Sequence, residues 1–227
     1  MKAAAAVAQN GSLAARSAAP ERPRRDGIRI DLQLIADMVG RSTRVLDVGC
    51  GDGALLDYLT RLKGADARGI EIDRERVAAC LNQGLSVIQG DAETDLADYP
   101  DKAFDCVVLS QTLQAVHDPR WMLEELLRIG TQAVVSITNA GYWRNRLGFM
   151  FRGREPFAVH PDETWYDTAY IHPCTIRDFV DLAREMGVRI ERCYAVNRSG
   201  TPRETNPGSG LANLFAIQAV FLLGEPA

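Results

Sequence analysis

The chain has 227 residues, a formal net charge of −4 and 46% hydrophobic residues, which is the composition of a globular domain with its own core. The acidic balance argues against general attraction to nucleic acid or to an anionic membrane, and no apolar run approaches the roughly 20 residues that span a bilayer. Five cysteines without a CxxC pair and three scattered histidines predict neither a disulfide framework nor a metal site. We therefore expect a protein of the reducing cytoplasm.

Residues 1–26 differ in composition from the rest of the chain. They are rich in Ala, Arg and Pro, and their first acidic residue is Glu21. A signal peptide fits poorly, because the short stretch 3–8 is followed at once by polar residues. We expect a disordered extension over 1–26, followed by a single domain over 27–227.

From residue 44 onward, short apolar runs alternate with amphipathic stretches. This alternation predicts an α/β fold with a doubly wound, mostly parallel sheet. Pro119 suits the first turn of a helix that Asp118 caps. The predicted strands are 45–48, 67–72, 85–89, 104–110 and 133–137, and the predicted helices are 53–62, 74–83 and 119–129.

The chain changes character after residue 138. Residues 139–174 are aromatic, Arg-rich and irregular, and we expect them to form a flap. A helix is predicted over 175–186, with Thr175 as its cap and Gly187 at its end. Two further strands, 188–196 and 214–223, bring the expected sheet to seven strands, and residues 198–210 between them should be an exposed, mobile connection.

A glycine turn and two acidic residues follow the first three predicted strands. In Asp47-Val48-Gly49-Cys50-Gly51-Asp52-Gly53 the glycines permit a tight turn and a close approach of the backbone to a ligand. Glu71 follows Gly49 by 22 residues, where an acid can accept hydrogen bonds from both hydroxyls of a ribose. Asp91 follows the third strand and could meet an adenine amino group. All three lie at the carboxyl edge of the sheet, where such ligands bind.

These segments, with Gly69-Ile70-Glu71-Ile72-Asp73 and Gly90-Asp91-Ala92, resemble the class I S-adenosylmethionine (SAM) dependent methyltransferase superfamily. The resemblance implies a Rossmann-like fold and SAM as the cofactor. A nicotinamide dehydrogenase fits less well, because its loop usually places the third glycine one residue further on. The resemblance implies that the cofactor site consists of Asp47, Gly49, Cys50, Gly51, Gly53, Glu71, Ile72, Asp91, Ala92 and Ser110.

A closer resemblance rests on three later stretches. They are 110–114, then Asn139 with 143–147, and then 165–168 with 171–176. Over about residues 29–197 the chain resembles the methionine biosynthesis protein MetW family. That resemblance implies a role in methionine biosynthesis and a homoserine O-acyltransferase as the partner. It leaves two functions open, a SAM-binding partner protein of that enzyme and an active methyltransferase on a small metabolite.

The candidates for catalysis are few. No Asn-Pro-Pro-aromatic tetrad follows the fourth strand, which disfavours methylation of an amide or a base amine. His172 is the better candidate base, with Asp167 as its neighbour in the flap, and the alternative is that the two only hold the flap together. His117 is expected to be a solvent-facing loop residue, and Cys174 to be structural.

Four arginines of the flap lie among aromatic residues. Three interpretations are open: an amphipathic lid helix, a surface for a partner protein, and a nucleic-acid contact. The net charge makes nucleic acid the least favoured of these. The arginines are Arg144, Arg146, Arg152 and Arg154, and the aromatic residues are Tyr142, Trp143, Phe149 and Phe151.

Overall fold

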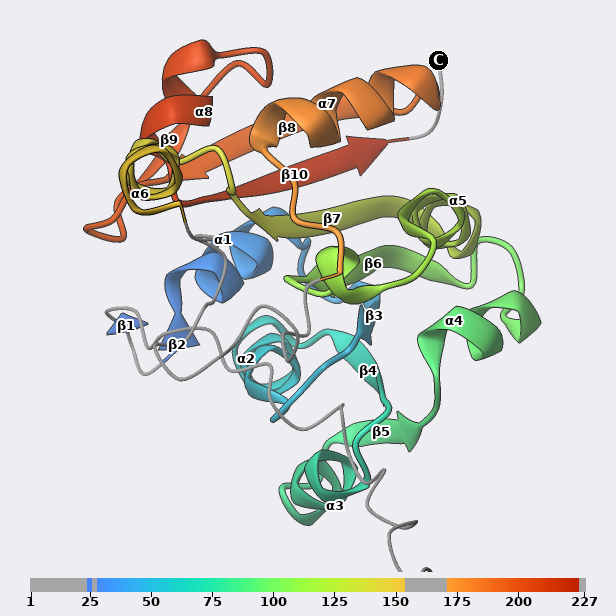
Figure 1. Ribbon diagram of the computed structural model, residues 1–227. Coiled ribbons are helices and arrows are strands. Elements are labelled where there is room, and N and C mark those ends of the chain that lie inside the picture. Colours follow the sequence, from blue (N-terminus) through green and yellow to red (C-terminus); the bar gives the residue numbers. More distant parts are fainter. Residues whose placement is uncertain (1–23, 26–27, 154–170, 225–227) are drawn as a thin grey trace, which may run out of the picture.

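The computed structural model describes residues 24–25, 28–153 and 171–224. Its centre is an eight-stranded sheet with the order β5-β4-β3-β6-β7-β10-β8-β9, seen in Figure 1 with helices on both of its faces. The strands are β3 (Arg44–Val48), β4 (Asp66–Glu71), β5 (Ser86–Gln89), β6 (Phe104–Ser110), β7 (Gly130–Thr138), β8 (Arg189–Val196), β9 (Pro202–Glu204) and β10 (Gln218–Gly224).

The pairing confirms the predicted fold class. Strands β3 to β7 pair in parallel, while β10 runs antiparallel between β7 and β8. The sheet has eight strands and not the expected seven. The additional strand, β9, lies within 198–210, where only an exposed connection is expected, and it pairs antiparallel with residues 194–196 of β8. Its stability comes from backbone pairing with a strand, which its Pro- and Ser-rich composition does not reveal.

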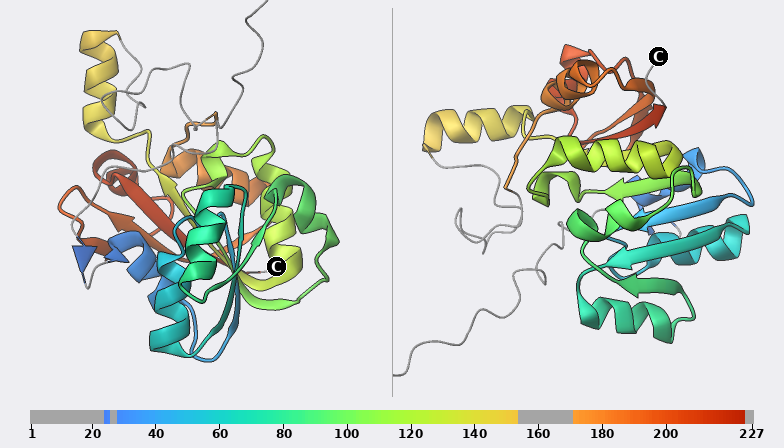
Figure 2. Two further views of the ribbon diagram at one scale, coloured as in Figure 1. Left: turned by 90° about the horizontal axis from the view of Figure 1, so that it is seen from below. Right: turned by 90° about the vertical axis from the view of Figure 1, so that its right-hand side faces the viewer.

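Two layers of helices cover the sheet. The first comprises α1 (Ile30–Met38), α2 (Ala54–Lys63) and α3 (Arg74–Asn82), and the second comprises α5 (Pro119–Ile129) and α7 (Ile176–Glu185). Figure 2 shows both layers, and it also shows α6 (Trp143–Arg152) extending away from the body of the molecule. The remaining short elements are β1 (Arg24–Arg25), β2 (Ile28–Arg29), α4 (Ala92–Asp95), α8 (Gly210–Phe215) and the 3-10 helices η2 (Leu96–Asp98) and η3 (Leu113–Ala115).

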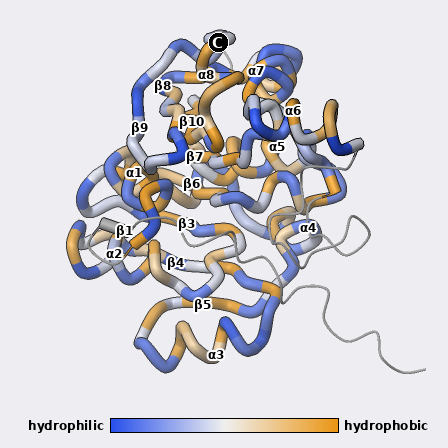
Figure 3. Tube along the Cα trace, turned by 60° about the vertical axis from the view of Figure 1, so that its left-hand side comes forward, coloured by the Kyte–Doolittle hydropathy of each residue, from blue (hydrophilic) through white to orange (hydrophobic). Residues whose placement is uncertain are grey.

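The core consists of two apolar clusters, one on each face of the sheet. Successive side chains of a strand point to opposite faces, so each central strand contributes to both clusters. In β6, Val107 belongs to the cluster beneath α5 and α7, and Val108 to the cluster beneath α1 and α2. Figure 3 shows both hydrophobic and hydrophilic residues along the surface helix α3.

Side-chain caps fix the helix ends where the sequence predicts them. Asp118 Oδ1 accepts a hydrogen bond from the amide of Trp121 at 3.0 Å, at the start of α5. Thr175 and Asp178 form a reciprocal capping box at the start of α7. Such caps satisfy amides that a helix leaves unpaired, and they act locally, so sequence alone identifies them.

Several further elements differ from the sequence-based expectation. Helix α1 is not predicted, and the strand expected over 214–223 begins only at Gln218 because residues 210–215 form α8. Helix α6 lies within the segment expected to be irregular, and it agrees with the interpretation of that segment's arginines as part of a helix. β1, which pairs with β2, falls inside the predicted extension, whose other residues lie outside the described part, as do residues 154–170 of the flap.

Candidate cofactor site

The loop between β3 and α2 is a glycine turn in a left-handed backbone conformation. Gly49, Gly51 and Gly53 have φ angles of 72°, 59° and 76°. A Cβ on Gly53 would lie 2.5 Å from Leu85 Cδ1, so this glycine is required for close packing. Within the described residues, a Cβ on Gly51 would have only Arg76 Nη1 near it, at 4.0 Å. The loop is therefore packed on one side and open at Gly51.

Glu71 lies at the end of β4 and fixes this loop. Its Oε2 accepts a hydrogen bond of 2.8 Å from the amide of Gly51, and its Oε1 accepts one of 3.0 Å from the amide of Asp73. The residue is only 5% exposed. The expectation of a strand-end acid that only faces a ligand is therefore incomplete, because Glu71 also holds two backbone segments in place.

Asp47 is a second buried carboxylate beside the loop. It is 2% exposed, and its Oδ1 has no hydrogen-bond partner within the described residues. Burial, and next the negative charge of Glu71, raise the pKa of Asp47 to about 7, while the positive charge of Arg29 opposes that shift. An ionised Asp47 would be stabilised by a nearby cation. Among the described residues, Arg29 is the cation that acts on it.

The other predicted cofactor residues lie along the same edge of the sheet. Asp91 caps α4, since its Oδ1 accepts a hydrogen bond of 2.9 Å from the amide of Glu93. Ala92 is the first residue of that helix. Ile72 is 51% exposed and follows Glu71, so it presents an apolar surface beside that carboxylate. Cys50 is buried, and burial raises the pKa of its thiol, which fits its interpretation as a small packing residue.

Ser110, at the end of β6, contacts a group of residues that the sequence did not indicate as part of the site. Its Oγ accepts a hydrogen bond of 3.3 Å from Arg29 Nη2. Arg29 also pairs with Asp31 at 2.8 Å, and Gln111 Nε2 donates to Asp31 Oδ2 at 3.0 Å. Asp31 is 1% exposed. The one signal in the sequence is that Arg29 and Asp31 alternate with apolar residues at the start of a helix.

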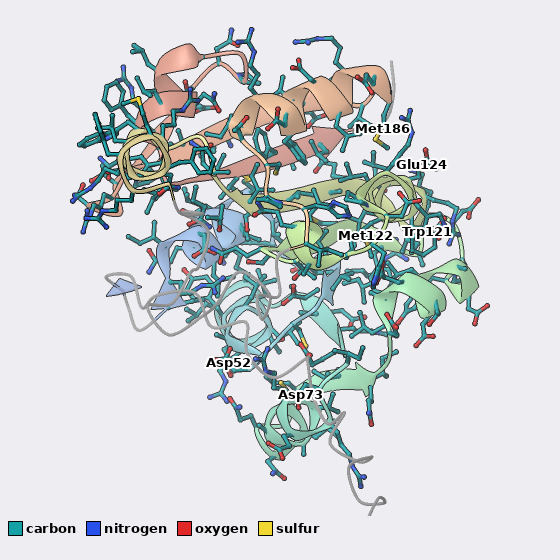
Figure 4. The ribbon with its side chains drawn as sticks, in the orientation of Figure 1. Asp52, Asp73, Trp121, Met122, Glu124 and Met186 are labelled. Atoms are coloured by element: carbon teal, nitrogen blue, oxygen red, sulfur yellow. The ribbon has the colours of Figure 1, made fainter. Side chains whose placement is uncertain are left out.

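Two aspartates mark the helix starts that flank the loop. Asp73 Oδ1 accepts a hydrogen bond of 2.8 Å from the amide of Glu75 at the start of α3, and Asp52 Oδ1 accepts one of 3.2 Å from the amide of Ala54 at the start of α2. Figure 4 shows Asp52 and Asp73 in the lower part of the molecule, near α2 and α3.

The candidate catalytic residues are placed only in part. His172 is exposed; its amide donates to the carbonyl of Gln114 at 3.0 Å, and its Nε2 lies 3.2 Å from the carbonyl of His117. Asp167 lies outside the described residues, so the pair is not tested. The His117 side chain is 85% exposed, and its hydrogen bond to Glu93 raises its pKa. Burial raises the pKa of Cys174 to about 12, as expected of a structural thiol.

The residues present fit a SAM-type cofactor. The loop is open at Gly51, Glu71 is held in a fixed orientation, and Asp47 has a buried oxygen without a partner. Asp91 comes just after β5, and Glu71, Asp47 and Ser110 lie at or near the carboxyl ends of β4, β3 and β6, the next strands in the sheet order. Among the described residues no group of His, Cys, Asp or Glu is arranged to hold a metal ion, and none of the described helices has the length and apolar character to cross a bilayer.

A groove of about 410 Å³ lies elsewhere, between α5 and the segment that joins the end of α7 to β8. Figure 4 shows two of its lining residues, Glu124 and Met186, far from Asp52 and Asp73. The groove is at the amino edge of the parallel strands, whereas ligands of this fold class bind at the carboxyl edge. It is therefore not the cofactor site.

The family model described as methionine biosynthesis protein MetW matches residues 29–223. The chain belongs to the MetW family. The bifunctional methionine biosynthesis protein MetXA/MetW of Rhodopirellula baltica is 32% identical over 173 residues, which are 72% of this chain and 28% of that protein. A ubiquinone biosynthesis O-methyltransferase of Psychrobacter cryohalolentis is 32% identical over 58% of this chain and 53% of its own length. This MetW-family chain thus spans about a quarter to a half of these two relatives.

Solved structures show the same fold for this MetW-family chain. A SAM-dependent methyltransferase of Thermotoga maritima superposes with a TM-score of 0.62 over 86% of each chain, at 18% identity. The [4+2]-cyclase SpnF superposes with a TM-score of 0.61 over 86% of this chain and 80% of its own, at 19% identity. These likenesses confirm the class I methyltransferase fold. They show the fold alone, since a methyltransferase and a cyclase share it.

Proposed function

We propose that this protein binds SAM at the glycine loop and acts as a SAM-responsive partner of a homoserine O-acyltransferase. The observation that carries the cofactor part is the carboxylate of Glu71, held by the amides of Gly51 and Asp73. A carboxylate has about four acceptor positions, and those two bonds leave acceptor positions for the two hydroxyls of a ribose. SAM is made from methionine, so its binding here would report the level of the end product to an early step of the pathway.

When bound, SAM supplies an activated methyl group on its sulfonium. The residues of this chain would position it: Glu71 at the ribose, Asp91 at the adenine and the glycine loop beneath the methionine part. For methyl transfer a deprotonated acceptor is also needed. His172 is the better candidate base among the described residues, and its Nε2 lies at hydrogen-bond distance from a backbone carbonyl. This weak catalytic arrangement favours sensing over turnover.

The partner part of the proposal rests on the relatives. The name of the Rhodopirellula baltica protein joins MetXA to MetW in one bifunctional chain, and this chain covers 28% of it. A fused chain keeps its two parts at high local concentration, and separate chains need a contact surface for the same purpose. This protein should therefore carry an exposed surface for the acyltransferase.

Helix α6 is our candidate for that surface. None of its ten residues is buried, and Phe149, Met150 and Phe151 are 60%, 64% and 77% exposed. Large apolar side chains gathered in this way mark interaction sites. Arg144 and Arg152 add positive charge, which favours an acidic face on the partner.

Hydrogen bonds fix the segment that precedes α6, so the start of the helix has a defined position on the domain. The Asn139 side chain donates to the carbonyls of Asn213 and Ala216, at the end of α8, and its Oδ1 accepts from the amides of Gly141 and Ile176. Arg146 Nε donates to the carbonyl of Gly141 at 2.6 Å. These bonds join β7, α6, α7 and α8 at one point.

Co-purification with the homoserine O-acyltransferase of the same organism tests the proposal. We expect a stable complex whose acyltransferase activity changes when SAM is added. The matched control is Glu71→Ala, which should keep the complex and lose the response to SAM. Absence of a complex, together with acyltransferase activity that this protein leaves unchanged, would refute the proposal.

A methyltransferase acting on a small metabolite is the second candidate. The similarity to a ubiquinone biosynthesis O-methyltransferase over 58% of this chain favours it. It requires conversion of SAM to S-adenosylhomocysteine in the presence of a metabolite extract. Loss of that conversion in His172→Ala, with SAM affinity retained, would support this function over the first.

A further inference from the structure

The loop that follows β6 touches the proposed cofactor site at two points. This loop, residues 112–117, contains η3, and we call it the coupling loop. At its start, Thr112 lies against the glycine turn, because a Cβ added to Gly49 would be 3.0 Å from Thr112 Oγ1. At its end, His117 contacts Glu93 twice. Its backbone amide donates to Glu93 Oε1 at 2.6 Å, and its Nδ1 lies 2.8 Å from Glu93 Oε2.

Glu93 is in turn held by a residue of the proposed cofactor site. It belongs to α4, whose cap is Asp91, and Asp91 Oδ1 accepts a hydrogen bond of 2.9 Å from the Glu93 amide. A ligand that fixes the Asp91 carboxylate therefore also fixes the start of α4, and with it the carboxylate that holds His117. The Glu93–His117 contact thus joins the adenine side of the site to the end of the coupling loop.

The other side of the coupling loop holds the segments that lead into α6 and α7. The carbonyl of Gln114 accepts hydrogen bonds of 3.0 Å from the amides of both Ile171 and His172, which precede α7. The Gln114 side chain pairs with the backbone of Thr138, the last residue of β7: its Oε1 accepts from the amide at 2.9 Å, and its Nε2 donates to the carbonyl at 3.1 Å. His172 Nε2 also lies 3.2 Å from the carbonyl of His117.

These two segments are bonded to each other before their helices begin. The amide of Ala140 donates to the carbonyl of Cys174 at 3.0 Å. The Oδ1 of Asn139 accepts from the amides of Gly141 and Ile176, one in each segment. A shift of the coupling loop would therefore move the starts of α6 and α7 together, because both segments share hydrogen bonds with the loop and with one another.

The coupling loop is well packed inside and exposed at its end. Leu113 and Val116 are 3% and 5% exposed and belong to the core cluster beneath α5 and α7. Close-packed elements respond to a local shift by moving as units. The His117 side chain, in contrast, is 85% exposed. Exposed ion pairs contribute little to stability, so its contact with Glu93 can be removed without loss of core packing.

We infer that the coupling loop transmits SAM binding to the acyltransferase surface on α6, and that His117 is the positioning residue that connects this loop to α4. The inference rests on the proposed function, because it needs a ligand at Asp91 and a partner at α6. Binding of SAM fixes Asp91 and so favours the position of α4 in which Glu93 holds His117. The acyltransferase, bound to α6, acts on the same loop from its other side.

Hydrogen exchange of the full wild-type chain, with and without SAM, tests the inference without a variant or a partner. SAM should slow the exchange of the amides of His117, Ile171 and His172, because these amides are bonded on the two sides of the coupling loop. Protection confined to the glycine loop and α4 would overturn the inference and leave the cofactor standing. No binding of SAM would instead refute the proposed cofactor, and the inference with it.

His117→Ala tests the residue in the complex with the homoserine O-acyltransferase. In the wild type, SAM should change the affinity for the acyltransferase by at least about 5-fold, and by reciprocity the acyltransferase should change SAM affinity by the same factor. In His117→Ala this factor should fall below about 2-fold, while SAM affinity and acyltransferase affinity measured separately stay close to wild type. A residue that only supports the local structure would lower the separate affinities and leave the factor unchanged.

Two further variants complete the test. Glu93→Ala should reduce the factor as much as His117→Ala does, and the double variant should reduce it no further, because the two residues act through one contact. The matched control is Arg44→Ala at the start of β3, where the backbone amide and the side chain of Arg44 both bond Asp105 at 2.8 Å. An unchanged factor in His117→Ala, or an equal loss in Arg44→Ala, would overturn the inference. A wild-type complex that does not respond to SAM would instead refute the proposed function.

Discussion

The carboxylate of Glu71 accepts a hydrogen bond of 2.8 Å from the amide of Gly51, which ties the end of β4 to the glycine loop that follows β3. Its second oxygen bonds the amide of Asp73, one residue before α3. A single side chain thus sets the shape of the loop and the direction of the acceptor positions that would meet a ribose. This dual role changes what its removal should do.

Glu71→Ala should lower SAM affinity by about 10- to 100-fold, because hydrogen bonds to a charged group contribute about 1.5–3 kcal/mol. The sequence alone suggests that fold stability would hardly change. The structure instead predicts a loss of about 1–3 kcal/mol in the free energy of unfolding, since two backbone amides lose their acceptor. Calorimetry and urea unfolding of the apo protein measure the two effects. Wild-type affinity in the variant would contradict the cofactor site.

Asp47 should make stability depend on pH. Its pKa is about 7 in the folded chain and near 4 in an unfolded one, so the folded state holds an extra proton between these values. Stability from this group is full below pH 4 and is lost as the pH rises to about 7. Asp47→Asn should therefore gain stability relative to wild type by up to about 1.4 kcal/mol per pH unit in that window.

Urea unfolding of both proteins at pH 5 and pH 7.5 checks this. The charges that act on Asp47 are Glu71 and Asp52, which raise its pKa, and Arg29, which lowers it. If the stability difference between variant and wild type stays constant with pH, Asp47 is already ionised in the apo protein.

Phe151→Asp on α6 should abolish co-purification with the acyltransferase while leaving the protein folded. The side chain is 77% exposed and α6 contributes no buried residue, so the melting temperature should stay close to that of wild type. Leu62→Asp on α2, where the side chain is 62% exposed, is the matched control and should keep the complex. A complex that survives Phe151→Asp would exclude this part of α6 from the interface. A lower melting temperature would show that α6 packs against this chain itself.

Asn139→Ala should destabilise the fold by at least about 2 kcal/mol, because two donors and two acceptors lose their partner at a site that is 1% exposed. Asn145→Ala is the control. Its side chain makes a long bond of 3.5 Å to Ala140 and should contribute little. Equal unfolding midpoints in urea would mean that water replaces Asn139 without loss.

Local signals in the sequence are strong where short-range interactions decide the structure. Strand 104–110 and helix 119–129 have the predicted bounds, and Asp118 and Thr175 cap the predicted helices. Apolar periodicity and capping act within a few residues, so they are readable without a partner segment. The glycine loop and the strand-end acids can likewise be recognised from short stretches of sequence. Their order along the chain predicted a candidate site at one edge of the sheet.

The tertiary structure decided what depends on residues far apart in the chain. Strand β9 exists because it pairs with β8, and Gln111 reaches Asp31 across 80 positions. Arg29 reaches Ser110 only because the fold brings the start of α1 to the end of β6. Sequence alone made Glu71 a ligand-facing acid; the fold also made it the acceptor that holds the loop. A buried polar atom destabilises the fold when it lacks a hydrogen-bond partner and stabilises it when it has one. Those partners often come from distant parts of the chain, so only the three-dimensional structure reveals them.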